Sequence, residues 1–183
     1  MNKRIRYAGK WLSLGEVDAT TAAGITHTWE FVTRAGTSDG AVCMIAIKRG
    51  TPDSIILVKQ FRPPIQAEII EFPAGLVEAG QSREDAALRE LREETGYVGK
   101  ILSQGPPIYN TPGMTDEHVA CITIEVTEQF AQQTEAHEDI EVIELPITDL
   151  KGQLLKLEAT GLRIDAKLWS FAEGLAFSNS LAP

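Results

Sequence analysis

A helical segment near the middle of the chain carries three glutamates that must lie on one face. Within residues 89–95, Glu90, Glu93 and Glu94 stand at positions i, i+3 and i+4. On a helix this spacing brings their Cβ atoms to roughly 5–6 Å from one another, and like charges so close together weaken the helix. Any fold of this chain must therefore leave the three carboxylates in water or bring positive charge to them.

The sequence around this segment indicates where the helix begins and ends. Residues 75–80 form a loop with glycine at both ends, and glycine lets backbone groups approach a ligand closely. Ser82 is a suitable N-cap with Asp85 three positions later, and Gly96 is a suitable C-terminal stop. We therefore expect a helix from Ser82 to about Thr95 that follows the loop directly.

The glutamates have two interpretations. The first is a solvated acidic face, which is what most charge runs on helices form. Arg89 can pair with Glu93 four positions later, but the face still keeps an excess of carboxylates. Carboxylate oxygens, water and phosphate oxygens are the ligands that Mg²⁺ and Mn²⁺ prefer. The excess charge beside a glycine-bounded loop favours the second interpretation, a site for a divalent cation.

Strand-like and helix-like segments follow one another irregularly along the chain. Residues 1–38 contain short β-like runs, and we expect a β-rich segment there, separate from a domain at residues 39–183. Further strands are predicted at 42–47, 55–58, 69–72, 119–126 and 140–145, and helices at 147–160 and 165–177. Because strict β-α-β alternation is lacking, the order favours an α+β sandwich.

Composition narrows the classes of partner. The net charge of −9 argues against nucleic acid, because phosphate backbones are held mainly by clustered Lys and Arg. The chain has no apolar run long enough to cross a bilayer, and no apolar stretch follows the basic residues 1–6 as in a signal peptide. We expect a cytoplasmic protein, compatible with presence in the nucleus, in which Cys43 and Cys121 are buried free thiols.

The segment that begins at Gly75 resembles the Nudix box, G-x5-E-x7-R-E-U-x-E-E-x-G-U, in which U is apolar. The matching positions are Gly75, Arg89, Glu90, Leu91, Glu93, Glu94, Gly96 and Tyr97. One fixed position differs, because Gln81 stands where the box has glutamate. A pattern with so many residues at fixed spacing is far more specific than a lone glycine motif. The chain is therefore identified as a member of the Nudix hydrolase superfamily.

The resemblance implies a fold and a set of metal ligands. Nudix hydrolases have a mixed β-sheet sandwiched between helices, an α/β/α arrangement in which the box forms a loop, a helix and a loop. By position, Glu90 and Glu94 are implied as the main metal ligands, with Glu93 close by. The backbone carbonyl of Ala74 is implied as a further ligand.

Segments 56–64 and 71–75 resemble the ADP-ribose and ADP-sugar pyrophosphatase branch of the superfamily. In that branch aromatic side chains from the N-terminal region stack on the adenine, in a site shared by two subunits, which implies a homodimer. The positions implied in substrate binding are Trp11, Trp29, Arg34, Arg62, Glu71 and, in a Pro-Gly element, Gly113 and Met114. Structural roles stay open for the tryptophans, as core or dimer-interface residues, and for the arginines, as surface ion-pair partners.

The resemblance also implies a reaction. Water would attack a phosphorus of the diphosphate and give AMP and ribose 5-phosphate from ADP-ribose, with Mg²⁺ as cofactor and Mn²⁺ as an alternative. The catalytic residues implied are Arg89, Glu90, Glu93, Glu94 and Glu138. Residues 134–139 resemble the loop that brings a further glutamate over the metal. Glu138 is the best match for the general base and an added ligand, with Glu135 and Glu93 as alternatives.

Two other functions are compatible with the sequence. The same chemistry can serve an ADP-sugar, an oxidised nucleoside diphosphate or a dinucleoside polyphosphate. A Nudix domain can also bind ADP-ribose as a sensor without cleaving it. Gln81 favours the sensor, because the family glutamate there is implied to engage Arg89, and glutamine keeps its shape without its charge. The intact glutamates of the box favour the enzyme, with altered rather than lost activity.

Overall fold

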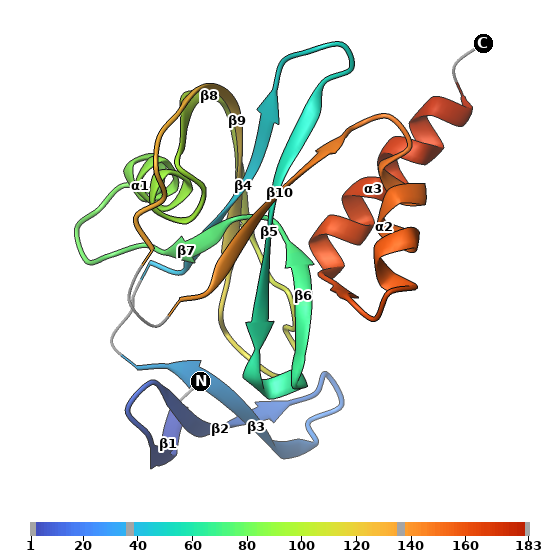
Figure 1. Cartoon of the computed structure of the whole chain (residues 1–183). Helices are drawn as coiled ribbons and strands as arrows, with labels where there is room; N and C mark the ends of the chain where they lie inside the picture. Colours follow the sequence, from blue (N-terminus) through green and yellow to red (C-terminus); the bar gives the residue numbers. More distant parts are fainter. Residues whose placement is uncertain (1–2, 36–38, 135–137, 182–183) are drawn as a thin grey trace.

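A mixed β-sheet runs through the centre of the molecule and is covered by helices on both faces (Figure 1). The computed structural model describes residues 3–35, 39–134 and 138–181. Helix α1 (Arg83–Thr95) covers one face, and helices α2 (Leu150–Glu158) and α3 (Ala166–Ser180) cover the other. This arrangement confirms the predicted α+β sandwich. Within the described ranges, none of the helices is both long enough and apolar enough to span a bilayer.

The central sheet has the order β11-β6-β5-β4-β9-β8, with β7 paired to β4 and β10 paired to β5. Its strands are β4 (Ala41–Lys48), β5 (Ser54–Arg62), β6 (Ala67–Glu71), β7 (Ala74–Leu76), β8 (Tyr97–Ile108), β9 (Val119–Gln129), β10 (Ile140–Pro146) and β11 (Arg163–Ile164), and a 3-10 turn (Pro63–Ile65) joins β5 to β6. Strands β4 and β9 are parallel neighbours at the centre. Both faces of β4 are covered, which explains its nearly continuous apolar sequence.

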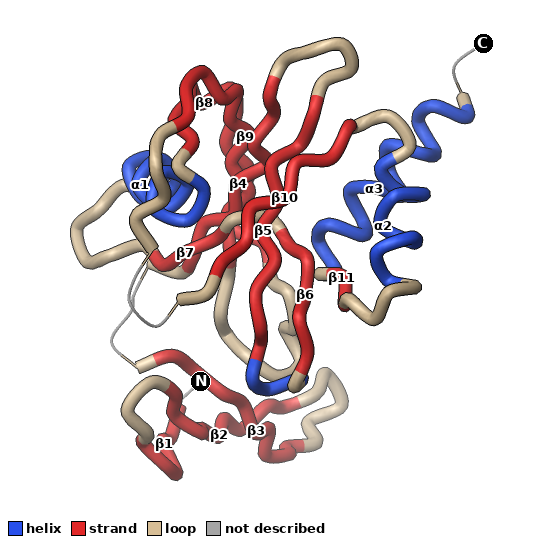
Figure 2. The backbone as a smooth tube through the Cα atoms, viewed as in Figure 1, coloured by secondary structure: helices blue, strands red, loops and turns tan. Residues whose placement is uncertain are grey.

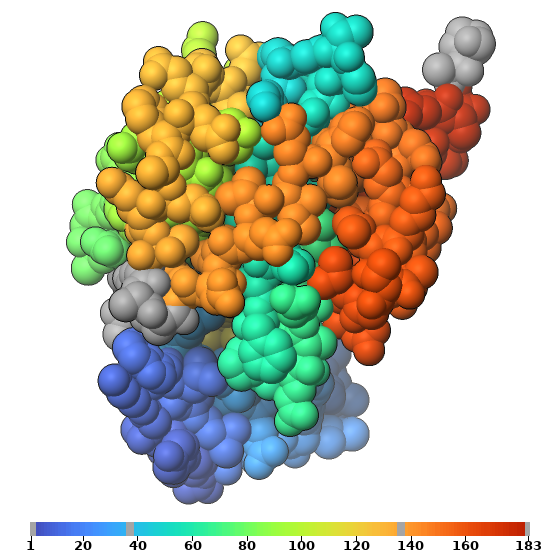
Figure 3. Space-filling view, in the orientation of Figure 1, coloured from blue at the N-terminus to red at the C-terminus, as the bar shows by residue number. Residues whose placement is uncertain are grey.

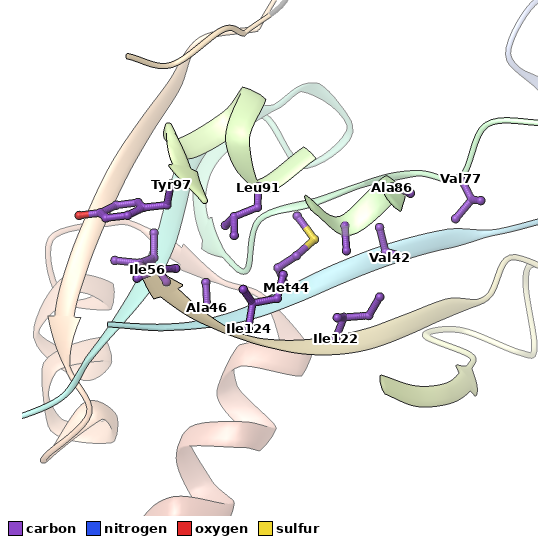
Figure 4. Packing of buried hydrophobic residues seen from close by; sticks show 12 residues of the cluster. Val42, Met44, Ala46, Ile56, Val77, Ala86, Leu91, Tyr97, Ile122 and Ile124 are labelled. Carbon is purple, nitrogen blue, oxygen red and sulfur yellow. The ribbon is translucent and has the colours of Figure 1, made fainter. Parts of the chain in front are cut away.

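Alternate residues of β4 face the two helical layers, as the two-residue period of a strand requires. Met44 belongs to the apolar cluster beneath α1, together with Leu91 and Ile124. Figure 4 shows Leu91 pointing from α1 toward the Met44 and Ile124 side chains. Cys43 belongs to the cluster on the opposite face, which includes Leu168 of α3. The position of α1 is therefore fixed by a dry contact with the sheet.

The N-terminal residues form a second, smaller sheet, which lies below the central sheet (Figure 2) and forms the blue part of the surface in Figure 3. Strands β1 (Lys3–Ala8), β2 (Leu12–Thr20) and β3 (Thr26–Arg34) are antiparallel and adjacent in sequence order. The predicted β-rich character is confirmed. The predicted boundary at residue 38 lies outside the described residues, and the division into two domains stays a prediction.

Several elements differ from the sequence prediction. The loop expected at 75–80 includes the end of β7, and β8 was not predicted because Gly99, Gly105, Pro106 and Pro107 interrupt its apolar pattern. Helix α2 begins at Leu150 rather than at residue 147. Strands β7 and β8 exist because a neighbouring strand pairs with them. Such pairing depends on distant segments and overrides local propensity.

We expect Leu91→Ala to destabilise the fold by about 2–5 kcal/mol, because Leu91 is fully buried and its loss leaves a cavity between α1 and the sheet. Leu102→Ala is the matched control, since Leu102 is 46% exposed on β8 and should change stability by about 0.5 kcal/mol or less. Urea unfolding followed by circular dichroism measures both. Equal losses for the two variants would contradict the assigned core.

Candidate active site

Helix α1 begins and ends at the residues that the sequence indicates. The Ser82 hydroxyl accepts a hydrogen bond from the Asp85 backbone N–H at 3.0 Å and donates one to the Asp85 carboxylate at 2.7 Å. Gly96 ends the helix with a φ of 75°, a conformation that favours glycine. Both ends of the helix are thus fixed by short-range contacts.

The carboxylate of Glu90 lies directly against the backbone of Gly75. A Cβ atom at residue 75 would stand only 1.9 Å from the Glu90 carboxyl carbon, so any side chain there would displace the carboxylate. The Glu90 side chain is only 15% exposed. Burial raises its pKa, and the nearby Arg89 guanidinium opposes this effect. Glycine at position 75 is therefore required by packing against a charged group.

Glu94 is buried behind Glu90, with 4% of its surface exposed. Its Oε2 atom accepts a hydrogen bond from the Ala74 backbone N–H at 3.0 Å. Loss of hydration on burial raises the pKa of Glu94 to about 8, although the Ala74 bond acts in the opposite direction. With a single hydrogen bond to oppose its burial, this carboxylate needs a nearby positive charge to be stable in its charged form.

Arg89 is the positive group that this helix itself supplies. Its guanidinium lies 2.9 Å from Glu93 and 3.0 Å from Glu90, which confirms the predicted i, i+4 pair. It also donates to the Leu76 carbonyl at 3.2 Å and to the Gln81 side-chain oxygen at 3.3 Å. The neutral Gln81 thus keeps a hydrogen bond to Arg89 and supplies no charge.

The donor set around α1 has the chemistry of a hard-cation site. No three acidic, histidine or cysteine side chains in residues 3–35, 39–134 and 138–181 already form a metal cage. Glu90 is nevertheless partly buried and Glu94 fully so, and burial raises the pKa values of both oxygen ligands. One arginine shared among the glutamates leaves an excess of carboxylate, and divalent Mg²⁺ or Mn²⁺ prefers such oxygen ligands. The residues present therefore fit a divalent cation.

A cavity of about 780 Å³ opens beside this face of α1. Its size is within the range of small-molecule sites. The predicted residues that line it are Trp11, Arg34, Arg62, Glu71, Ala74, Arg89, Glu90, Glu93 and Glu138. Residues from the N-terminal sheet, β5, β6, β7 and α1 therefore meet around one space, although the sequence separates them widely.

Four predicted site residues lie outside the cavity lining. Glu94 is buried behind it, as described above. Trp29 donates a hydrogen bond from its indole N–H to the Gly113 carbonyl at 3.0 Å, and the Met114 carbonyl accepts one from the Val32 backbone N–H at 2.8 Å. These contacts join the N-terminal sheet to the segment before β9. Trp29 and Met114 are both largely exposed in the single chain.

The arginines of the cavity have carboxylate partners. The Arg62 Nε lies 2.9 Å from Glu71, and Arg34 forms an ion pair with Glu117. Arg62 is bound through Nε alone in the described contacts, so the rest of its fork is available to other acceptors. The pairing holds both guanidinium groups at the cavity wall.

Sequence reasoning missed several residues of the cavity. Glu117, Lys167 and Gln133 line it but match no part of the motifs. Lys167 lies at the start of α3 and pairs with Asp165 at 2.9 Å, and this aspartate caps the helix. The capping pattern is visible in the sequence, but the approach of α3 to the cavity depends on the pairing of β11 with β6.

The two residues that precede the loop at 134–139 are hydrogen-bonded to the end of α1. The Gln132 side-chain amide donates to the Glu94 carbonyl at 2.6 Å and to the Ile140 carbonyl at 3.2 Å, and the Gln133 N–H donates to the Glu93 carbonyl at 2.9 Å. Glu138 lines the cavity. The alternative Glu135 lies outside the described residues.

Comparison with known proteins yields a consistent set of relatives. The family described as NUDIX domain matches residues 37–168. The chain is 37% identical to an ADP-ribose pyrophosphatase of Saccharomyces cerevisiae over 91% of its own length and 77% of that protein. It is 39% identical to an ADP-sugar pyrophosphatase of Mus musculus, over 94% and 84% of the two chains. A solved structure described as an ADP compounds hydrolase has the same fold, with a TM-score of 0.65 at 16% identity over 85% of this chain and 81% of that one.

We expect Glu94→Gln to stabilise the metal-free protein at pH 8 and to have little effect near pH 4.5. Below about 4.5 the carboxyl is neutral in both states. As the pH rises toward 8, the unfolded chain releases this proton and the folded chain retains it, so wild-type stability falls by up to about 1.4 kcal/mol per pH unit. Glutamine keeps an oxygen acceptor for the Ala74 N–H and does not titrate.

Melting temperatures in chelator at several pH values test this difference. Glu84→Gln, on the exposed first turn of α1, is the control and should follow the wild type. A wild-type minus Glu94→Gln difference that does not change with pH would mean that Glu94 is not a buried acid of raised pKa.

Proposed function

The chain belongs to the Nudix family of hydrolases, and on this premise we propose that it hydrolyses the diphosphate bond of ADP-ribose and related ADP-sugars. The products from ADP-ribose are AMP and ribose 5-phosphate. The single observation that carries the proposal is the cavity, whose lining joins two carboxylates of α1 with two arginines and an indole, namely Glu90, Glu93, Arg34, Arg62 and Trp11. The names of the two relatives above support the choice of substrate.

The wall opposite α1 suits the organic part of such a substrate. Trp11 is 69% exposed and lines the cavity. The Lys10 ammonium lies over one face of its indole, 4.6 Å from the ring centroid, so a purine would stack on the other face. Stacking of a base on an aromatic side chain contributes roughly 1–3 kcal/mol. Arg62, already oriented by Glu71, presents further N–H donors, and an arginine fork matches phosphate oxygens. Gly113 and Met114 contribute to binding indirectly. Their carbonyls accept hydrogen bonds from the N-terminal sheet and so help to hold Trp11 at the cavity.

Mg²⁺ is the proposed cofactor, with Mn²⁺ as the alternative, and its ligands are Glu90, Glu94, Glu138 and the Ala74 carbonyl. When bound, the cation lowers the pKa of a coordinated water and neutralises charge on the diphosphate oxygens. The protein's part is to hold these oxygens in place. Gly75 leaves room for Glu90, and the Ala74 N–H orients Glu94. Arg89 keeps Glu93 beside them.

Glu138 is the proposed general base. It lines the same cavity as Glu90 and Glu93, and its loop is held at its root by the bonds of Gln132 and Gln133 to the end of α1. In the reaction its carboxylate oxygen accepts a proton from the water that attacks phosphorus. Because water is the nucleophile, the chain need not supply one. The acidic side chains of the site act as proton acceptor and as ligands instead.

A sensor that binds ADP-ribose without cleaving it is the second candidate. It is favoured by one observation, the neutral Gln81 as the hydrogen-bond partner of Arg89. The two functions differ in one measurable product, because only the enzyme releases AMP. A cytoplasmic location stays a prediction from the sequence.

We expect the protein to release AMP from ADP-ribose with Mg²⁺ and to release none in chelator. Glu90→Gln should lower kcat/KM at least about 10- to 100-fold, as changes around a metal typically do. Glu84→Gln changes an exposed glutamate of the same helix and should keep wild-type activity. Chromatographic separation of AMP measures both. Binding of ADP-ribose without AMP would favour the sensor, and AMP from other diphosphates alone would change the substrate.

Glu138→Gln should reduce kcat by about 100-fold or more, the typical contribution of a general base, while ADP-ribose affinity at saturating Mg²⁺ changes much less, because glutamine keeps an oxygen for the cation but cannot take up the proton. Glu141→Gln is the control, because the Glu141 side chain is 63% exposed and paired with Lys59. Steady-state rates and equilibrium titration separate the two effects. A Glu138→Gln enzyme with near wild-type kcat would exclude Glu138 as the base and leave Glu93 or Glu135.

We also propose a homodimer in which the N-terminal sheet contacts a second copy. The sheet leaves large apolar side chains exposed, namely Ile5, Tyr7, Trp11, Leu12, Leu14, Ile25 and Trp29. A surface of this kind favours burial against another protein surface.

Leu12→Glu should convert the dimer to monomer in sedimentation velocity. Leu155→Glu on α2 should leave it intact, although both leucines are 49% exposed. A wild-type protein that sediments as a monomer at micromolar concentration would exclude the dimer.

A further inference from the structure

The chain has two cysteines, and the fold places them side by side. Cys43 of β4 and Cys121 of β9 are direct partners in the parallel register at the centre of the sheet. Their sulfur atoms lie 3.1 Å apart. Figure 1 shows these two strands as neighbours. Segments 78 residues apart in sequence thus bring both thiols of the molecule into contact.

The two thiols differ in their surroundings. Cys43 is fully buried beneath α2 and α3, whereas Cys121 is partly exposed. The hydrogen bond with Cys43 lowers the pKa of Cys121 to about 7, and the Lys167 ammonium acts in the same direction. A thiolate is the form that reacts with oxidants. Cys121 therefore has the features of an attacking thiol, and Cys43 those of a resolving thiol held beside it.

We propose that Cys121 and Cys43 form a peroxide-reactive dithiol that closes to a disulfide between β4 and β9. The Cys121 thiolate attacks a hydrogen peroxide oxygen, the O–O bond breaks, and with one proton a sulfenic acid and water result. The Cys43 sulfur then attacks the sulfenic sulfur, its proton leaves with the hydroxyl as water, and the S–S bond forms. In total two thiols lose two electrons and two protons, and one peroxide becomes two waters.

The bond would act on the site described above. Cys43 also pairs with Ala74 of β7, on the other side of β4, and the Met44 N–H donates to the Pro73 carbonyl at 2.8 Å. A disulfide brings two sulfurs to about 2.05 Å, so the 3.1 Å contact must shorten, through rotation of the two side chains and adjustment of β4 against β9. Since the Ala74 N–H orients Glu94, we expect oxidation to lower turnover several-fold. This last step rests on the proposed function.

The test treats the reduced full-length protein with hydrogen peroxide, blocks remaining thiols with N-ethylmaleimide and measures intact mass. In the wild type neither cysteine should be alkylated after oxidation, and the mass should fall by two hydrogens. The protein should run as a single chain on a non-reducing denaturing gel, and dithiothreitol should restore both thiols. Cys43→Ala should stop at a sulfenic acid that dimedone traps on Cys121. Cys121→Ala should stay unreacted, because its remaining thiol is buried.

Three outcomes would overturn the dithiol. The first is that both wild-type thiols remain reduced at a peroxide concentration that oxidises glutathione. The second is a disulfide that joins two chains. The third is oxidation of Cys121 to a sulfinic acid while Cys43 stays a free thiol. All three outcomes are measured on the wild type, so they decide the proposal even if the cysteine variants fail to fold. AMP release before and after oxidation tests the link to Ala74, and an unchanged rate excludes it. A reduced protein without AMP release contradicts the proposed function and leaves the thiol result intact.

Discussion

The contact between Glu90 and the backbone of Gly75 is the constraint on which the site depends. It requires α1 to lie close to β7, and it holds a carboxylate where hydration is incomplete. The apolar contact of Leu91 with the sheet keeps the helix there against the repulsion of its own glutamates. Packing energy thus maintains an arrangement of charges that would be unstable on an isolated helix. The excess of negative charge favours a cation at this face of the helix.

The cavity depends on a second, weaker contact, between the N-terminal sheet and the segment that joins β8 to β9. Backbone and indole N–H groups of β3 donate to the carbonyls of Met114 and Gly113, and Lys3 pairs with Asp116 at 2.6 Å. These are polar contacts at the surface, where ion pairs contribute little stability. The positions of the cavity's acidic side chains are therefore fixed by the packed core, whereas the position of Trp11 depends on these polar surface contacts.

Much of the fold and of the carboxylate site was predictable because the signals are local. Ser82 and Gly96 mark the ends of α1 through their own backbone preferences, and the spacing of the glutamates fixes their common face. Glu117 and Lys167 were missed because they reach the cavity only through strand pairing between distant segments. Strand β7 was missed for the same reason. Local chemistry is readable in one sequence, but the meeting of remote segments is not.

The free edges of the central sheet have a further consequence. Strand β11 at one edge is two residues long, strand β8 at another has a register that shifts at three places along its pairing with β9, and strand β10 is a third edge that pairs with β5 alone among the described strands. Pro106 and Pro107 of β8 have no N–H to donate to an added strand. Short, bulged and proline-containing edges prevent strands of different molecules from pairing. Growth of the sheet into a fibre is therefore disfavoured at β11 and β8, and β10 ends at Pro146, which likewise has no N–H to donate.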